Sequence, residues 1–331
     1  MSNEKAIYTG WKKWTPTIDE WARFITEPYL PFPMEENEYL LVYVEEEGKK
    51  KLTAQYYLEG GKLIKFGRSS ISWDFSKFKP EPTEVEVLDS EIDDIEKRKR
   101  AKKSTSKKSK SLKNSYTISP LNDEQVAAFD LMNNDNITFK LLSGNFGSGK
   151  TLLTCAKAID MLIHNKVEKI VWIRNVVKAK GTETLGYLPG DLWSKIRPWI
   201  APLIDNLKSE SAVLHMIERG QLEIVELDKI RGRSIDNAVI ISTESQNLTE
   251  DLLQLILGRV GKGSYLFMEG DLRQVDRDIF EKSQGMKAAI RDLVGERLFG
   301  YVDLPVDERS ETARLADKIG RRAPKAQNNT Q

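Results

Sequence analysis

The residues best suited to chemistry in this sequence lie in one glycine-rich stretch. The stretch reads Gly144-Asn145-Phe146-Gly147-Ser148-Gly149-Lys150-Thr151. It matches the phosphate-binding pattern G-x-x-x-x-G-K-[ST] at every fixed position. The pattern predicts that Lys150 reaches the β- and γ-phosphates of a nucleotide and that Thr151 offers its hydroxyl to Mg²⁺. Glycine at three positions allows the loop to bend and to approach phosphate oxygens closely. The stretch therefore predicts that the protein binds a nucleoside triphosphate.

The segments on either side of this loop have the composition that a phosphate site needs. Residues 137–142 are rich in β-branched and aromatic side chains and predict a strand. Residues 152–165 predict a helix, whose apolar positions at spacings of three or four are Leu152, Ala156, Ile159 and Ile163. A strand, a loop and a helix in this order place backbone N–H groups and a helix N-terminus around one anion. This context favours a phosphate site, which would include Leu152, over a chance glycine-rich turn.

Further apolar runs predict the fold class. Residues 169–173, 238–242 and 265–269 are almost continuously apolar, as strands of a parallel sheet buried on both faces are. Helical patterns such as residues 251–259 lie between them. We therefore expect an α/β nucleotide-binding domain with a mainly parallel sheet and its ligand at the carboxyl ends of the strands.

The rest of the chain divides by composition. Residues 1–88 predict a small β-rich module with a short helical start, with strands at 39–44, 51–58 and 62–66. Its expected aromatic core residues are Trp11, Trp14, Trp21, Phe24 and Trp73. Residues 89–115 hold an acidic block and then a Lys/Arg/Ser block with hardly an apolar residue, which predicts a disordered linker. The basic block could bind nucleic acid phosphates or serve only as a solvated linker. Residues 116–322 form the expected nucleotide-binding domain, and residues 323–331 a polar tail.

Composition sets limits on the class of protein. The 331 residues carry a net charge of +1, so the molecule as a whole has no basic bias. The single cysteine, Cys155, excludes an internal disulfide and suits a reducing compartment. No apolar run approaches the ~18 residues of a transmembrane helix, and the first residues lack the apolar core of a signal peptide. We therefore expect a soluble cytoplasmic protein.

Polar residues that follow the predicted strands are candidates for the site. Glu244 could deprotonate an attacking water as a general base, and Gln246 could sense the γ-phosphate. The same residues could instead form a cap cluster that opens the helix near Thr249. After the next strand, Asp271 could face the nucleotide and the amide of Gln274 could contact both γ-phosphate and water.

One further candidate lies at the start of the domain. Asn122 has the features of a helix cap, and Gln125 falls in the first turn of that helix. The amide of Gln125 could bond an adenine edge through two hydrogen bonds, or it could be an ordinary residue of the helix surface.

These elements, in this order, resemble the PhoH-like family, P-loop ATPases related to superfamily 1 helicase motors. The resemblance spans about residues 119–319. Besides the phosphate loop, it rests on Gly186-Tyr187-Leu188-Pro189-Gly190-Asp191-Leu192, Ile230-Arg231-Gly232-Arg233-Ser234, Glu244-Ser245-Gln246-Asn247 and Gly270-Asp271-Leu272-Arg273-Gln274. It implies a RecA-like core that uses ATP and Mg²⁺, often assembled into a ring such as a hexamer. It also implies RNA or single-stranded DNA as a partner. Residues 1–115 resemble the β-rich connecting module of longer relatives rather than their RNA-cleaving domain.

One departure from the family pattern concerns the metal. The family's second motif is Asp-Glu-Ala-Gln-Asn, and its Asp helps to hold Mg²⁺; here Thr243 stands at that position. Threonine is neutral and cannot replace a carboxylate as a strong Mg²⁺ anchor, although it could hold a metal-bound water. The sequence thus predicts either an ATPase with a weakened metal site or a protein that binds ATP without efficient hydrolysis.

Several arginines complete the candidates. Arg309 falls where the resemblance places a finger that points at the γ-phosphate of a neighbouring subunit, or it could pair with Asp307 or Glu308. Arg174, together with the loop that holds Arg231 and Arg233, could contact nucleic acid or lie on an ordinary surface turn.

Two functions follow from these observations. The first is an ATPase coupled to remodelling or unwinding of RNA or single-stranded DNA, which must oligomerise because one chain holds a single RecA-like domain. The second is an ATP-binding scaffold or regulatory protein whose N-terminal module recruits a protein or nucleic acid partner.

Overall fold

A six-stranded, entirely parallel sheet forms the centre of the computed structural model, which describes residues 8–27, 30–74, 115–174, 193, 196–272 and 284–308. The strand order is β12-β7-β11-β10-β8-β9. The strands are β7 (Phe139–Gly144), β8 (Lys169–Arg174), β9 (Leu222–Glu226), β10 (Ala238–Ser242), β11 (Tyr265–Gly270) and β12 (Phe299–Leu304). The apolar runs at 169–173, 238–242 and 265–269 form β8, β10 and β11. This result confirms the predicted α/β fold with a parallel sheet.

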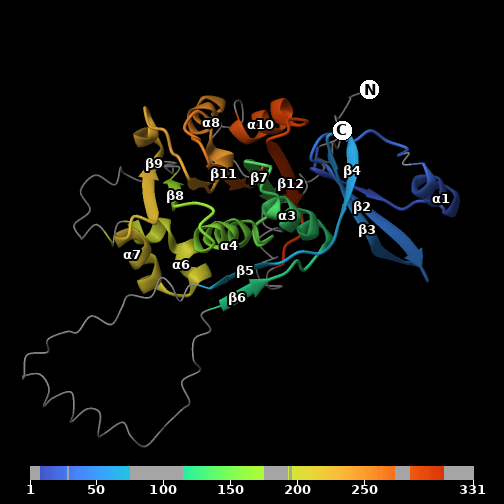
Figure 1. Cartoon of the computed structure of the whole chain (residues 1–331), viewed down its shortest axis with the longest axis horizontal. Helices are drawn as coiled ribbons and strands as arrows, with labels where there is room; N and C mark the ends of the chain where they lie inside the picture. The colour runs from blue at the N-terminus through green and yellow to red at the C-terminus, as the bar shows by residue number, and fades with distance from the viewer. Residues whose placement is uncertain are drawn as a thin grey trace, which may run out of the picture.

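Both faces of this sheet are covered by helices, because the strands are apolar on both sides. Every residue of β7 and β10 is buried. Successive side chains point to opposite faces, so Trp172 and Val171 belong to two different apolar clusters. The first cluster includes side chains of α3 (Asp123–Asn133), α4 (Lys150–Ile163), α6 (Ala201–Leu207) and α7 (Glu210–Glu218). The second includes side chains of α8 (Glu250–Leu257) and α10 (Gly285–Leu293), which lie on the opposite side of the sheet (Figure 1).

Side-chain caps fix where several helices begin. Asn122 accepts a hydrogen bond from the backbone N–H of Gln125 and so caps α3, as its residue type predicts. Thr249 caps α8 by accepting from the backbone N–H of Leu252. The short 3-10 turns at Arg197–Trp199, Leu227–Ile230 and Ser245–Asn247 (η2, η3 and η4) link the longer elements. No helix in the described ranges is long and apolar enough to cross a membrane.

The N-terminal module is a four-stranded sheet with one helix. Its strands, in the order β1-β2-β3-β4, are β1 (Trp11–Trp14), β2 (Tyr39–Glu46), β3 (Lys49–Glu59) and β4 (Lys62–Phe66), and its helix is α1 (Ile18–Thr26). Gly60 and Gly61 both have positive φ and form the tight turn between β3 and β4. Trp14 and Phe24 lie in the core of this module. Trp11 and Trp73, expected in the same core, pack instead against the cluster beneath the parallel sheet.

A two-stranded sheet accompanies the phosphate-loop helix. Residues Ile71–Asp74 (β5) pair antiparallel with Ser115–Ile118 (β6), and Trp73 stacks on Tyr116 with ring centroids 5.6 Å apart. Residues 75–114, which hold most of the predicted linker, and the predicted tail at 323–331 lie outside the described residues. The domain boundaries therefore stay predictions.

The N-terminal module is joined to the α/β domain along β12. The indole N–H of Trp11 donates to the carbonyl oxygen of Asp303 over 2.9 Å. The side-chain amide of Asn37 donates to the carbonyl oxygen of Phe299 over 2.8 Å, and the Tyr39 hydroxyl bonds Asp130 of α3. Figure 1 shows β2 and β3 beside α3 and β12. These contacts hold β12, which borders the phosphate-loop strand, from its outer side.

Candidate nucleotide site

The glycine-rich loop connects the end of β7 to the start of α4, as the sequence predicts. Gly144, Gly147 and Gly149 all have positive φ, at 147°, 76° and 92°. At Gly144 a side chain is excluded, because its Cβ would lie 2.2 Å from the carbonyl oxygen of Leu304 on β12. The close packing of β12 against the first residue of the loop thus requires glycine there.

Lys150 and Thr151 begin helix α4 and face the site. The ammonium of Lys150 donates to the carbonyl oxygens of Gly144 and Asn145, over 2.9 and 2.8 Å. The hydroxyl of Thr151 donates to Oε1 of Glu269 over 3.0 Å. The two residues with predicted roles toward phosphate and metal are therefore held on the inner side of the loop, and a carboxylate lies next to Thr151.

A polar cavity of about 480 Å³ lies between the loop and the carboxyl ends of β10 and β11. Besides loop residues, it is lined by the carboxylates of Asp205, Glu244, Glu269 and Asp271. Burial raises the pKa of the Glu269 carboxyl to about 7. The charge of Lys150 opposes this rise, the charge of Glu244 adds to it, and the hydrogen bond from Thr151 opposes it. Four carboxyl groups thus line the cavity, and the one on Glu269 lies beside Thr151.

A buried glutamine connects the ends of β10 and β11. The side-chain N–H of Gln246 donates to Oε2 of Glu244 over 2.7 Å, and its oxygen accepts from the backbone N–H of Asp271 over 3.2 Å. A Cβ at Gly270 would lie 2.6 Å from the same oxygen, so glycine is needed there for space. Glu244 itself adopts the left-handed region, with φ at 52°. Gln246 therefore positions two acidic residues, and its predicted contact with the γ-phosphate stays a prediction.

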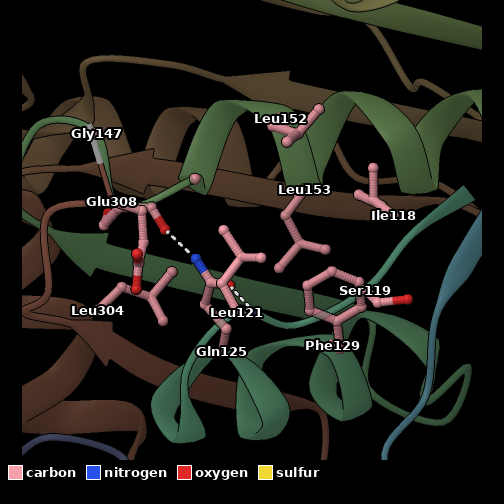
Figure 2. Close-up of a pocket in the computed structure, with 12 residues that line it drawn as sticks. Ile118, Ser119, Leu121, Gln125, Phe129, Gly147, Leu152, Leu153, Leu304 and Glu308 are labelled. Carbon is pink, nitrogen blue, oxygen red and sulfur yellow. Dashed lines mark hydrogen bonds between the residues drawn. The ribbon is translucent and has the colours of Figure 1, made fainter. Parts of the chain in front are cut away.

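An apolar cavity of about 430 Å³ lies on the other side of the same loop. Its walls include Ile118, Leu121, Phe129, Leu152, Leu153 and Leu304. Figure 2 shows the side chain of Gln125, from α3, among these residues. Its oxygen accepts from the backbone N–H of Leu121 over 2.7 Å, and its amide donates to the carbonyl oxygen of Ser148 over 3.0 Å. Gln125 thereby ties the start of the domain to the phosphate loop.

Most of the predicted site residues lie around these two cavities. The residues brought together are Gln125, the loop residues 144–151, Leu152, Glu244, Gln246 and Asp271. Gln274, Arg309, the side chain of Arg174 and the motif at 186–192 lie outside the described residues. Arg233 forms a two-pronged ion pair with Glu223, and the contact of this loop with nucleic acid stays a prediction.

Glu269 is the site residue that sequence reasoning missed. Its place at the end of an apolar run, directly before Gly270 and Asp271, was the available signal. Among the described residues, no group of three or more His, Cys, Asp or Glu side chains could hold a metal ion by itself. Mg²⁺ usually takes one or two carboxylates together with phosphate oxygens and waters, and Glu269 beside the Thr151 hydroxyl offers one carboxylate.

Comparison with known proteins identifies the family. The family model for PhoH-like proteins matches residues 117–316, which include the loop, both cavities and all six strands of the parallel sheet. This chain belongs to the PhoH-like family. That family consists of P-loop ATPases, so the resemblance inferred from the motifs is confirmed.

Curated relatives show the same relationship. The chain is 33% identical over 199 residues to Protein PhoH2 of Mycolicibacterium smegmatis, covering 59% of this chain and 46% of the relative. It is 34% identical over 215 residues to Protein PhoH2 of Bacillus subtilis, covering 61% and 47%. It is 38% identical over 156 residues to a PhoH-like protein of Bacillus subtilis, covering 46% and 47%. The chain thus spans about half the length of the curated relatives it matches.

Proposed function

We propose that this PhoH-like protein binds ATP with Mg²⁺ and hydrolyses it, and that RNA or single-stranded DNA is its partner in a homo-oligomer. The observation that carries the nucleotide part is the position of the phosphate loop between an apolar and an acidic cavity. A nucleoside triphosphate has the same division, with an apolar base at one end and charged phosphates at the other. One molecule can therefore fill both cavities across the loop.

The apolar cavity suits the adenine base. Leu121 is 72% exposed and Leu152 is 40% exposed on its rim, and a base placed there would cover both. The amide of Gln125 keeps one N–H and one oxygen lone pair beyond its bonds to Leu121 and Ser148. That amide can pair with a donor and an acceptor on the adenine edge.

The polar cavity suits the phosphates and the metal. Lys150 can exchange its bonds to the carbonyl oxygens of Gly144 and Asn145 for bonds to phosphate oxygens, since an ammonium binds an anion more strongly than a neutral carbonyl. The hydroxyl of Thr151 would hold Mg²⁺, which when bound supplies charge neutralisation between the β- and γ-phosphates.

Glu244 is the proposed general base. Its side chain is exposed at the cavity, and a hydrogen bond from Gln246 fixes its position. Its left-handed backbone is a conformation that non-glycine residues rarely adopt and that clusters at active sites. We assign Glu244 the orientation and deprotonation of the attacking water. Gln274 and Arg309 keep their predicted roles toward the γ-phosphate.

Nucleic acid binding and assembly rest on the sequence and the family. The block of Lys and Arg at residues 97–113 can neutralise phosphates, which is the sequence-independent part of nucleic acid affinity. A single RecA-like domain can move along a strand only together with neighbouring copies, one of which would supply Arg309. The second candidate function, an ATP-binding scaffold with weak hydrolysis, is favoured by the neutral Thr243 in place of the family's Asp.

An ATPase assay with the full chain tests this proposal. Wild type, Lys150→Ala and Lys62→Ala are compared with and without single-stranded RNA, single-stranded DNA and double-stranded RNA. Lys62 is an exposed lysine of β4 in the N-terminal module, so its variant controls for loss of one positive charge. We expect loss of turnover in Lys150→Ala alone, and stimulation of wild type by single strands.

The outcomes separate the two functions. ATP binding without turnover above that of Lys150→Ala would overturn the enzyme in favour of the scaffold. Turnover that no nucleic acid changes would overturn the proposed partner, and a species that sediments as a monomer with ATP would overturn the oligomer.

A further inference from the structure

We infer that Glu269 on β11 supplies the carboxylate that secures Mg²⁺ beside Thr151, in place of the carboxylate missing at position 243 on β10. The inference rests on the proposed binding of ATP with Mg²⁺. It differs from the family pattern, in which an Asp after β10 carries this role. The sequence alone leaves two alternatives at Thr243, a weakened metal site or ATP binding without efficient hydrolysis. A carboxylate at Glu269 removes the basis of both, because the site then keeps a negative charge on the neighbouring strand.

The contact to Thr151 is the first observation. The Thr151 hydroxyl donates to Oε1 of Glu269 over 3.0 Å. A carboxylate at this distance from a metal-binding hydroxyl can fix its orientation and share the same cation or one of its waters. The site-facing carboxylate is also close enough to Lys150 and Glu244 to interact with both charges.

Strand register is the second observation. Strand β11 lies between β7 and β10, so it is the direct neighbour of the strand that leads into the phosphate loop. Ser242 on β10 is paired with Met268 on β11, and therefore the next residues, Thr243 and Glu269, lie at the same level of the two strands. A carboxylate on β11 stands one strand, roughly 4.8 Å, nearer to the loop strand than one on β10. The two positions are adjacent alternatives for the same charge.

Burial is the third observation. Glu269 is only 3% exposed, and a buried carboxylate is costly unless hydrogen bonds or a cation stabilise it. Within the described part of the chain it accepts a hydrogen bond from Thr151, whereas a carboxylate offers about four acceptor positions. It also lines the acidic cavity. A bound divalent cation would use the remaining acceptor positions and compensate the buried charge.

Metal affinity, measured apart from turnover, tests the inference. Mn²⁺ is titrated by electron paramagnetic resonance into the full chain with a non-hydrolysable ATP analogue. The variants are Glu269→Gln, Thr243→Asp and the double variant. Gln keeps the volume and can still accept from Thr151, but removes the charge. Glu45→Gln removes a negative charge from an exposed position of β2, outside the cavity, and is the matched control.

We expect Glu269→Gln to weaken Mn²⁺ binding about 10- to 100-fold, as loss of a supporting ligand usually does. Glu45→Gln should leave it unchanged, and Thr243→Asp should restore the affinity in the Glu269→Gln background. Affinity for the analogue in EDTA should not fall in Glu269→Gln, because this variant removes a negative charge beside the phosphates. If Glu269→Gln fails to fold, Glu269→Asp serves instead. Asp keeps the charge on a shorter side chain, which places the carboxylate farther from Thr151, so an intermediate weakening of Mn²⁺ binding is expected.

Each other result counts against the inference. Unchanged Mn²⁺ affinity in Glu269→Gln, with the analogue still bound, would make Glu269 a structural acceptor for Thr151. Lack of restoration by Thr243→Asp would show that the two positions are not equivalent. A wild type that fails to bind the analogue at all would instead refute the proposed function, so the two failures are distinguishable.

Discussion

We predict that Lys140, the second residue of β7, makes the free energy of unfolding of this protein rise with pH. Its side chain is fully buried, and its ammonium donates to the carbonyl oxygen of Met132 over 2.8 Å. The rings of Tyr265 and Phe267 lie 5.9 and 5.5 Å away. Burial, helped by the charges of two neighbouring lysines and opposed by two aspartates, lowers the pKa of Lys140 from 10.5 to about 7. We predict that Lys140→Met, which keeps the length of the side chain, removes this dependence.

The magnitude follows from the two pKa values. One pKa unit corresponds to about 1.4 kcal/mol, so the fall from 10.5 to about 7 corresponds to roughly 5 kcal/mol. Between these values the unfolded chain carries the proton and the folded chain does not, and therefore the free energy of unfolding rises with pH. Below the folded pKa both states are protonated, and wild type bears the full cost of the buried charge. The rise should amount to about 1.4 kcal/mol per pH unit.

Urea unfolding of the full chain measures this effect. Wild type and Lys140→Met are compared from about pH 7.5 to about pH 9.5. Over this range the free energy of unfolding of wild type should rise by about 3 kcal/mol relative to that of Lys140→Met. Groups that titrate in both proteins contribute equally to the two free energies of unfolding, so their contributions cancel in the difference. Lys62→Met, at an exposed position of β4, should follow wild type. Profiles of wild type and Lys140→Met that stay parallel within about 0.5 kcal/mol would refute the reasoning.

Three other substitutions test the packing that positions the site. Gly144→Ala places a Cβ 2.2 Å from the carbonyl oxygen of Leu304, and we expect a loss of about 3 kcal/mol or more in urea unfolding; a loss below about 1 kcal/mol would show that β12 can move away. Gln246→Ala removes the oxygen that accepts from the buried backbone N–H of Asp271, so it should cost about 1–3 kcal/mol and weaken nucleotide binding, measured with a fluorescent ATP analogue. Unchanged binding would show that Gln246 does not position the site. Asn37→Ala removes an amide that donates to three backbone carbonyls before and within β12, and it should cost about 2 kcal/mol. Backbone hydrogen exchange should become faster along β12. Unchanged exchange in β12 would contradict the role given to this contact.

The parts of the fold that were predictable are those fixed by local pattern. The phosphate loop followed from glycine spacing, the parallel strands from apolar runs, and the start of α3 from Asn122. Each of these signals lies within a few residues along the chain. The predicted family and α/β fold were confirmed for this reason.

The contacts that were not predictable join distant segments. Trp11 looked like core material of its own module, yet its indole bonds the carbonyl oxygen of Asp303, 292 positions away. Aromatic composition shows that a side chain needs burial but not which cluster buries it. The hydrogen bonds of Gln125 and Gln246 could not be predicted from the sequence either, because a side-chain amide that could bind a ligand can equally join two backbone segments.

Glu269 shows how a local interpretation of a motif changes when strand order is known. Along the chain, Thr243 replaces the Asp of the family pattern, and this replacement alone predicts a weakened metal site. In the sheet, β11 lies between β10 and the loop strand, and the register places Glu269 level with position 243. The electrostatic requirement of Mg²⁺ is for negative charge near Thr151, whichever strand supplies it. A substitution at one strand end therefore weakens a metal site only if no neighbouring strand end carries the charge. Here the neighbouring strand end does carry one, because the carboxylate of Glu269 accepts a hydrogen bond from Thr151.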